Sequence, residues 1–486
     1  MNQQEGGSIQ EININIPKIC VVVFGLYIVL VVAFYFLAGE QLHLRQSRGE
    51  WTMPVAEAGT VELVQDATVE QVFKVNIQRL QSVSVQCGTY YRSNAGIVTM
   101  ELWNINSGTC LLTEQYDATT IEEGGLLTLT AKEPLEGLYG IPLMLRIYAN
   151  SQLGSAVSPL MSASVQKDDF SLYLNGIEVM GLLCFSVSGQ DYIWTGLHYW
   201  KFSVGFGLLL ALMLFYVYHQ WKTGRHSYIV YALVAMKKYR FLIRQLVARD
   251  FKTKYKRSVL GIFWSFLNPL FTMSVQYFIF STIFKSDISN YAVYLLIGIV
   301  SFNFFNESCG MALVSIISNA GLITKVYMPK YIYPLTRIMS SVVNLGISLL
   351  PLLIVTLVTG VKLQKSAVLA FYFLVCLIIF SLGVGLLLSA AMVFFRDTQF
   401  LWGIFSMMWM YATPIFYPEN ILPDQFRFIL QMNPLYHFLK NIRLCILEGI
   451  SPEPIIYMQC ILIAFGVLLI GTLVFQKTQD QFVLYL

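Results

Sequence analysis

The stretch RDFKTKYKRSVLGIFWSFLNPL at residues 249–270 decides the fold. Residues 249–257 hold five Lys or Arg side chains and one Asp, and a charge-free apolar run follows from Val259 to Phe284. A bilayer core about 30 Å thick needs roughly 20 apolar residues in a helix, so this run predicts a membrane span. An excess of Lys and Arg beside a span is typical of its cytoplasmic end. The stretch therefore predicts a membrane protein with residues 249–257 in the cytoplasm.

Further charge-free runs of this length occur along the chain. They are Ile19–Ala38, Phe202–Tyr218, Ile338–Val361, Ser366–Phe395, Thr398–Pro418, Ile455–Gln476 and Tyr291–Thr324, the last broken only by Glu307. The predicted fold class is an α-helical polytopic membrane protein with eight spans. An even number of spans places both termini on one side, and the basic cluster makes that side the cytoplasm. Only 12% of the 486 residues are charged, which excludes a disordered chain and disfavours a soluble multidomain enzyme.

Charge divides the chain into predicted domains. Residues 39–200 hold 17 acidic and 8 basic side chains, whereas residues 222–257 hold 11 basic and one acidic. The net charge of +4 is a sum of opposite compartments, and no nucleic-acid partner is expected. The predicted order is a cytoplasmic N-terminus (1–17), a transmembrane helix (18–38), an extracytoplasmic β-rich domain (39–200), a transmembrane helix (201–221), a cytoplasmic amphipathic interface helix (222–257) and a six-span core (258–486).

The first span has two interpretations, a cleaved signal peptide and a retained anchor. Its apolar run of about 20 residues exceeds the roughly 7–15 of a signal peptide. Phe36 and Ala38 flank Leu37, so no small-residue cleavage pattern follows. Both observations favour a retained anchor.

Residues 50–180 alternate apolar and polar side chains, as at Leu143, Leu145 and Ile147. Alternation of period two between glycine-containing turns predicts about eight short antiparallel strands in a β-sandwich. Cys87 and Cys110 lie in this domain, where a disulfide and two free thiols are about equally compatible with the sequence. Six aromatic side chains either stack on sugar rings or pack as ordinary strand residues. They are Tyr90, Tyr91, Trp103, Tyr116, Tyr139 and Tyr148.

An apolar stripe and a basic stripe at helical spacing precede the first core span. Their members are Ile243, Leu246 and Val247, and Lys237, Arg240 and Arg244. A helix of this kind lies along the membrane surface. It either anchors the topology on anionic lipid or contacts a cytoplasmic partner.

The quoted stretch resembles the start of the first core span in bacterial ABC polysaccharide-export permeases. The shared pattern is a basic, tyrosine-containing approach, then Leu-Gly, an aromatic residue and a Pro-Leu pair. NAGLITKVYMPK at 319–330 resembles the family's cytoplasmic coupling helix, and FRDT at 395–398 with TPIFYP at 413–418 resembles its short inner turn and the segment after that turn. NPLY at 433–436 resembles its outer re-entrant region. The resemblance covers about residues 227–486, and typical members lack the two spans and the outer domain that precede them.

The resemblance implies the permease of an exporter in the bacterial cytoplasmic membrane. Its cargo would be O-antigen, capsule or teichoic-acid chains on an undecaprenyl-pyrophosphate-type lipid. Two copies of this chain would form the pore, and two separate ATPase subunits would bind ATP and Mg. The chain itself would be no enzyme and would bind no cofactor or metal. A coupling helix is expected at 318–335 and the re-entrant region at 419–450.

Three sets of site residues are expected from the resemblance and from the chemistry of their side chains. The residues expected to couple to the ATPase are Asn319, Leu322, Ile323, Lys325, Val326, Tyr327 and Pro329. The residues expected to meet the lipid phosphate, through paired charges, are Arg244, Arg249, Lys252, Lys254, Tyr255 and Arg257. The pore-lining candidates are Phe263, Trp264, Phe266, Phe302, Phe305, Tyr411 and Phe416, for which an interfacial belt or core packing is the alternative.

Glu307 is the only acid that the sequence places deep within a span. Ionisable groups in membranes are costly and are functional hypotheses by default. A structural contact with Asn303, Asn306 or Ser308 is the alternative to a role in transport.

Other chemistries find little support in the sequence. No phosphate-binding loop G-x-x-x-x-G-K-[ST] occurs, and the glycines around Gly383 indicate helix packing. Asp250, Asp397 and Glu419 are isolated and form no D-x-D pair, which disfavours a membrane-embedded glycosyltransferase or polymerase. Export of another lipid or drug, and a receptor or scaffold role, are the remaining alternatives.

Overall fold

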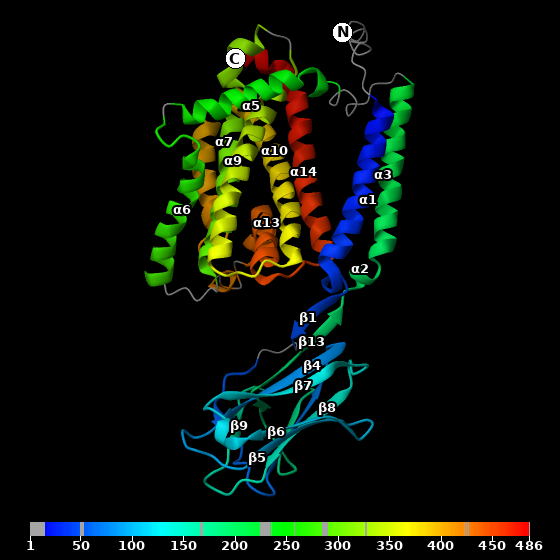
Figure 1. The fold of residues 1–486 in the computed structure, drawn as a ribbon, viewed down its shortest axis with the longest axis vertical. Coiled ribbons are helices and arrows are strands. Elements are labelled where there is room, and N and C mark those ends of the chain that lie inside the picture. The colour runs from blue at the N-terminus through cyan, green and yellow to red at the C-terminus, as the bar shows by residue number, and fades with distance from the viewer. Residues whose placement is uncertain are drawn as a thin grey trace. The chain divides into compact units, whose positions relative to one another are not determined.

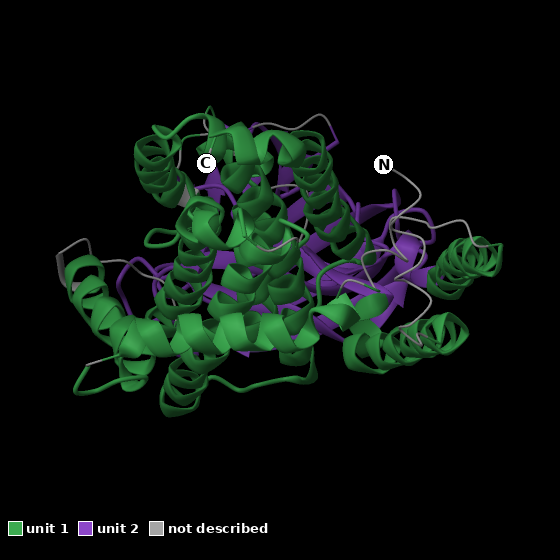
Figure 2. Cartoon of the chain, turned by 90° about the horizontal axis from the view of Figure 1, so that it is seen from above, with its two compact units in different colours: residues 1–42, 198–486 green, residues 43–197 purple. Residues whose placement is uncertain are grey.

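The computed structural model describes residues 15–48, 53–165, 169–223, 234, 236–256, 258–283, 290–325, 328–421, 423, 425 and 427–485. The predicted site residues Arg257, Val326 and Tyr327 lie outside the described residues. The chain divides into two compact units, which Figure 2 colours separately. Residues 43–197 form the β unit, and residues 1–42 with 198–486 form the helical unit.

The β unit consists of two antiparallel sheets. The strands are β1 Leu44–Arg48, β2 Ala58–Gly59, β3 Thr68–Lys74, β4 Arg79–Gly88, β5 Ile97–Asn104, β6 Thr109–Asp117, β7 Gly125–Glu136, β8 Pro142–Ala149, β9 Ser158–Ser162, β10 Ser171–Leu174, β11 Ile177–Val179, β12 Leu182–Leu183 and β13 Phe185–Tyr192. One sheet has the order β1-β13-β4-β9-β12, with β2 on β9 and β7 on β4. The other has the order β11-β10-β3-β8-β5-β6. The prediction of a β-rich domain is confirmed.

Alternation along the strands explains why the two sheets share one hydrophobic core. Leu143, Leu145 and Ile147 on β8 are each 0% exposed, and Val83 and Val187 from the other sheet join the same buried cluster. Cys87 is buried on β4 and Cys110 is exposed on β6, and both thiols are free. The free-thiol interpretation therefore holds. Burial raises the pKa of the Cys87 thiol to about 12, so this thiol is unreactive near neutral pH.

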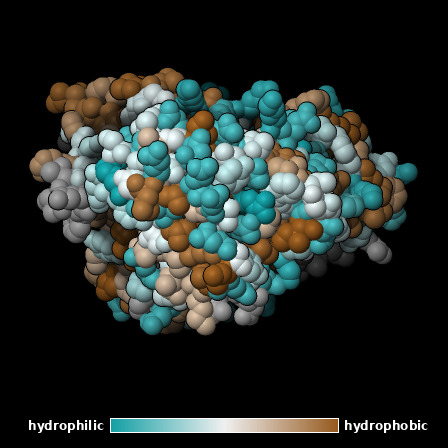
Figure 3. Space-filling model, turned by 90° about the horizontal axis from the view of Figure 1, so that it is seen from below, coloured by the Kyte–Doolittle hydropathy of each residue, from teal (hydrophilic) through white to brown (hydrophobic). Residues whose placement is uncertain are grey.

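The molecular surface mixes side chains of both kinds. The face drawn in Figure 3 carries hydrophilic side chains over much of its area, with hydrophobic ones among them.

The helical unit contains short and long helices. Its α-helices are α1 Ile16–Ala38, α3 Tyr199–Lys222, α5 Arg240–Tyr255, α6 Phe263–Tyr277, α7 Tyr291–Leu313, α8 Ala320–Ile323, α9 Ile332–Val358, α10 Ala370–Phe394, α11 Thr398–Ala412, α12 Arg427–Met432, α13 Pro434–Arg443, α14 Pro454–Thr478 and α15 Phe482–Tyr485. Figure 1 shows α5 lying across one end of the upright helices, where it packs on α9. The short helix α2, Trp194–Leu197, belongs to the β unit.

Within the described part of the chain, six helices are long and apolar enough to cross a membrane. They are Ile16–Leu42, Tyr199–Lys222, Tyr291–Leu313, Ile332–Val358, Lys365–Phe394 and Pro454–Tyr485. The predicted spans Val259–Phe284 and Thr398–Pro418 contain α6 and α11, each of only 15 residues. A helix of that length rises about 22 Å, which is less than a bilayer core. A π-helical segment, Phe278–Ile283, extends α6, and the count of eight spans stays a prediction.

Helix α10 lies at the centre of the helical unit, against α7, α13 and α14. Its contact with α14 depends on glycine, because a Cβ built on Gly471 would lie 2.3 Å from the carbonyl oxygen of Gly383. No side chain fits at that distance, so the two backbones touch directly. The interpretation of Gly383 as a helix-packing position is confirmed.

The two N-terminal helices of this unit contact each other and the core. The Tyr27 hydroxyl on α1 donates to the Ser203 carbonyl on α3 (2.6 Å). The Phe34 ring packs edge-to-face with Tyr457 on α14, with centroids 4.8 Å apart. These contacts make α1 part of the helical unit, and the retained anchor stays a prediction.

The segment expected to be re-entrant folds into α12 and α13. Asn433 begins α13 by accepting a hydrogen bond from the Leu435 amide (3.1 Å), a usual N-cap, and Pro434 suits the first helical position. Arg443 at the other end of α13 is buried and donates to the carbonyl of Pro414 (2.6 Å) and that of Tyr294 (3.2 Å). A buried arginine thus ties α13 to α7 and to the turn after α11.

Candidate functional site

Helix α7 has an exposed polar face. Most of its residues are buried, but Asn303 and Asn306 are exposed and Glu307 is half-buried. Their spacing of three and four residues places the three side chains on one side of the helix. An unsatisfied polar group in hydrocarbon costs several kcal/mol, so this face is unsuited to lipid. It suits water, a polar cargo or a second protein surface.

Glu307 is paired with two neighbouring helices. Lys254 Nζ on α5 lies 2.8 Å from Glu307 Oε1, and Asn344 on α9 donates to Glu307 Oε2 (2.9 Å). Ser308, one of the structural partners considered for Glu307, donates instead to the Phe305 carbonyl (3.0 Å). Glu307 precedes the last residue of α7 by six residues, about 9 Å at 1.5 Å per residue, so it lies near the end that α5 crosses and not at mid-helix.

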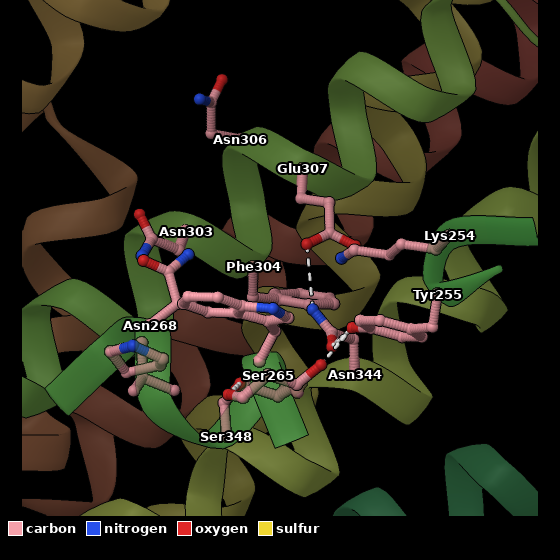
Figure 4. A pocket seen from close by; sticks show the side chains of 14 residues that line it. Lys254, Tyr255, Ser265, Asn268, Asn303, Phe304, Asn306, Glu307, Asn344 and Ser348 are labelled. Carbon is pink, nitrogen blue, oxygen red and sulfur yellow. Dashed lines mark hydrogen bonds and ion pairs between the residues drawn. The ribbon is translucent and has the colours of Figure 1, made fainter. Parts of the chain in front are cut away.

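A cavity of about 320 Å³ opens beside this pair, between α6, α7, α9 and the end of α5. We call it the amide pocket, because its polar lining includes Asn268, Asn303, Asn306, Asn344, Ser265 and Ser348. Trp264, Phe304 and Tyr255 supply aromatic surface. Figure 4 shows the Asn268 and Asn303 amides close together and Lys254 directed at Glu307. The Tyr255 hydroxyl hydrogen-bonds Ser265 and donates to Asn344 Oδ1 (2.9 Å), which fixes one wall.

A second cavity, of about 640 Å³, shares Lys254 and Glu307 with the first. We call it the arginine pocket. The Asp250 side chain there is 4% exposed, and its Oδ1 lies 3.0 Å from Arg249 Nη2 and 3.1 Å from Arg337 Nη1. Arg249 also donates to Asn319 Oδ1 (3.5 Å). Asp250 therefore links α5 and α9, and Arg249 extends the link to the segment before α8.

The residues expected at a lipid phosphate divide into two groups. Arg244 and Lys252 are exposed on α5 and remain open to a charged ligand. Arg249, Lys254 and Tyr255 are engaged in the contacts just described, so they shape the two pockets. The structure thus brings Arg249, Lys254 and Tyr255 together at the pockets. Arg244 and Lys252 lie apart from them.

The expected coupling residues also divide. Leu322 and Ile323 pack against the buried Ile332 and Tyr333, while Asn319 is buried and donates to the Ser315 carbonyl (2.7 Å). These three residues anchor the segment. Lys325 is exposed and Pro329 is half-buried, so Lys325 is the described member best placed to contact another protein.

The pore-lining candidates separate by exposure. Phe263 (51% exposed), Trp264 (44%) and Tyr411 (61%) face outward, and Phe266 stacks on Phe263. By contrast, Phe302, Phe305 and Phe416 are at most 8% exposed and belong to the core. The pore-lining interpretation is therefore wrong for these three in this conformation: ring packing, such as Phe305 on Trp409, accounts for them.

Sequence reasoning missed Asn344, Arg337 and the burial of Asp250. An asparagine inside the charge-free run Ile338–Val361 was a usable signal, since a buried or membrane-embedded amide needs a partner. No pattern indicated that Asp250 and Arg337, 87 positions apart, meet.

Comparison with known proteins places these pockets in a recognised region. A family model described as "ABC-2 type transporter" matches residues 242–447. The O-antigen export system permease protein RfbA of Klebsiella pneumoniae is 31% identical over 244 residues, which is 50% of this chain and 93% of the relative. RfbA of Myxococcus xanthus is 26% identical over 246 residues, 50% of this chain and 95% of the relative. The polysialic acid transport protein KpsM of Escherichia coli is 24% identical over 246 residues, 49% of this chain and 93% of the relative.

Proposed function

Because this chain belongs to the family of permease subunits of ABC-type polysaccharide exporters, we propose that it moves a lipid-linked polysaccharide outward across the bacterial cytoplasmic membrane. The single observation that carries the proposal, beside the family, is the exposed polar face of α7 next to the exposed aromatic rings of α6. Lipid would penalise that face, whereas a hydrated polymer would be matched by it.

Two copies of the chain would complete the pore. The exposed amides of α7 and the outward aromatic rings of α6 would then line a path between the copies. This arrangement removes the polar face from lipid without any further protein.

ATP hydrolysis would occur in a separate subunit, because the sequence contains no G-x-x-x-x-G-K-[ST] loop. That subunit would bind at the end of the bundle crossed by α5, where Lys325 is exposed. With this end in the cytoplasm, both termini would be cytoplasmic and the β unit extracytoplasmic, as the Lys and Arg distribution predicts.

The lipid pyrophosphate would approach through exposed Arg244 and Lys252 on α5. Lys and Arg form strong charge-assisted hydrogen bonds with phosphate oxygens. The arginine pocket lies on the same helix and carries one more positive than negative side chain, since Arg249, Lys254 and Arg337 face Asp250 and Glu307.

The test uses a host strain in which the gene is deleted. The expected result is loss of surface polysaccharide with intracellular accumulation of the lipid-linked polymer, and recovery of both by the intact gene. Unchanged surface polysaccharide in the deletion strain would contradict the proposal. So would ATP hydrolysis or sugar transfer by the purified chain alone.

A further inference from the structure

We propose that the amide pocket binds a neutral sugar unit of the exported polymer, an inference that rests on the proposed function. The pocket would hold the sugar by amide and hydroxyl hydrogen bonds above an aromatic wall.

The first observation is hydrogen-bonding capacity that the protein leaves unused. Among the described residues, no side-chain hydrogen-bond partner lies at Asn303 or Asn306, and Asn268 accepts only a long bond from Thr272 (3.4 Å). Each amide offers donors and an acceptor, as do the adjacent hydroxyls of a sugar ring. All three amides are exposed in the single chain, so they remain available to a ligand rich in hydroxyls.

The second observation is charge. The amide pocket contains one cation and one anion, Lys254 and Glu307, and they are paired at 2.8 Å. Its net charge is zero, so it has no preference for an anion. The adjoining arginine pocket has the positive excess and would take the phosphate instead. The two pockets share this ion pair, and a phosphate in one with a sugar in the other matches the order of groups along a lipid-linked glycan.

The third observation is surface and size. Trp264 is 44% exposed at the pocket, and Tyr255 and Phe304 border the same space. Ring faces of this kind pack against the C–H groups of a sugar. A volume of about 320 Å³ lies at the lower end of ligand sites, which suits one or a few rings and not a long segment of polymer.

The experiment measures sugar binding by the full-length chain in complex with its ATPase in lipid nanodiscs. The probe is the lipid-free oligosaccharide that mild acid releases from the host's own polymer, and calorimetry gives its Kd. The test variant combines Asn268→Leu and Asn303→Leu, two exposed positions where leucine keeps the volume. The control is Ser274→Leu, an exposed position on α6 that does not line the pocket.

The expected result is binding about tenfold weaker in the test variant and unchanged in the control, because two sugar hydrogen bonds are lost. Inorganic pyrophosphate should not displace the oligosaccharide. Equal Kd values in all three proteins, with export by the wild-type chain intact, would overturn the sugar site and leave the proposed function standing. Displacement of the oligosaccharide by pyrophosphate would also overturn it. So would unchanged binding by the test variant when that variant no longer forms the two-copy assembly. Failure of the wild-type chain to export would remove the proposed function itself.

Discussion

At the residue scale, the Lys254–Glu307 pair is the feature most open to measurement. Its side chains are 39% and 27% exposed, so solvent weakens the attraction without removing it. The carboxylate also accepts from Asn344 (2.9 Å), so α5, α7 and α9 meet at this one group. Loss of one charge leaves the other partly buried and uncompensated.

We predict that Lys254→Met and Glu307→Gln are not additive. Each single change should lower the stability of the purified chain by about 1 kcal/mol, or about 2 °C in Tm. The double change should cost less than the sum of the two, because neither charge is then left alone. Thermal unfolding in detergent measures all four proteins. Strict additivity would show that the pair contributes nothing.

A second residue-scale prediction concerns Glu123 in the β unit. Hydrogen bonds from the Thr89 hydroxyl and amide and from the Tyr91 amide lower the pKa of Glu123. They hold a loop in which Tyr90 and Tyr91 adopt positive φ values of 57° and 56°, a conformation that non-glycine residues rarely take.

Because the pKa of Glu123 is lower in the folded chain, its stabilisation is present above the unfolded value of about 4.3 and is lost as the pH falls through the folded value. We expect hydrogen exchange at Thr89 and Tyr91, corrected for intrinsic rates, to accelerate at low pH. In Glu123→Gln it should be fast at neutral pH too. Glu122→Gln, an exposed neighbour, is the control. Identical protection in the wild-type chain and Glu123→Gln would contradict the account.

At the element scale, the segment around α8 is the part of the permease that we expect the ATPase subunit to contact. Ile323 is buried and Leu322 half-buried in one cluster with residues of α9, so the segment is packed on that helix, and its exposed Lys325 is left for contact. Mutation of a charge at the rim of an interface typically changes the association rate and its salt dependence.

We therefore expect Lys325→Glu to reduce export about fivefold and to weaken the coupling of the partner's ATPase to transport. Lys477→Glu, an exposed lysine on α14, is the matched control. Both variants are assayed for polymer transport and ATP hydrolysis in proteoliposomes. Normal coupling in Lys325→Glu would remove this residue from the interface.

The contact between α10 and α14 gives a sharper prediction. Gly471→Ala should destabilise the helical unit by about 3 kcal/mol or more, because the added Cβ meets the Gly383 carbonyl at 2.3 Å. Gly466→Ala on the same helix has open space around its new methyl group and should be neutral or slightly stabilising. The Tm values of the two purified variants measure this difference in stability. Equal values would show that the two backbones do not touch.

The sequence predicted most elements here because their signals are local. Apolar runs predicted α1, α3, α7, α9, α10 and α14, and period-two alternation predicted β3, β4 and β8. The sequence overestimated the length of α11, because the run Thr398–Pro418 is free of charge but its backbone becomes extended at Thr413, just before Pro414. The amide pocket was out of reach, since it depends on which faces of α6, α7 and α9 meet. The residues implied by the resemblance lay around it, but their division into exposed and buried members is tertiary information.

At the scale of the whole molecule, the chain consists of two units, each with its own core. We predict that replacing residues 45–191 by a short turn leaves the helical unit folded, with its Tm changed by less than about 3 °C. Size-exclusion profiles and thermal unfolding of the shortened chain test this. Collapse of the helical unit would show that it needs the β unit to fold.

The strands that open and close the β unit have one more consequence. β1 and β13 pair antiparallel from Leu44–Tyr192 to Arg48–Ser188, so the chain enters and leaves the unit at neighbouring positions. Tension applied through the two flanking helices would pull both strands apart from that same end. The hydrogen bonds of the ladder would then break one after another, as in a zipper, and not all together. A load on the β unit would thus separate β1 from β13 at low force, while the hydrophobic cores of both units stayed intact.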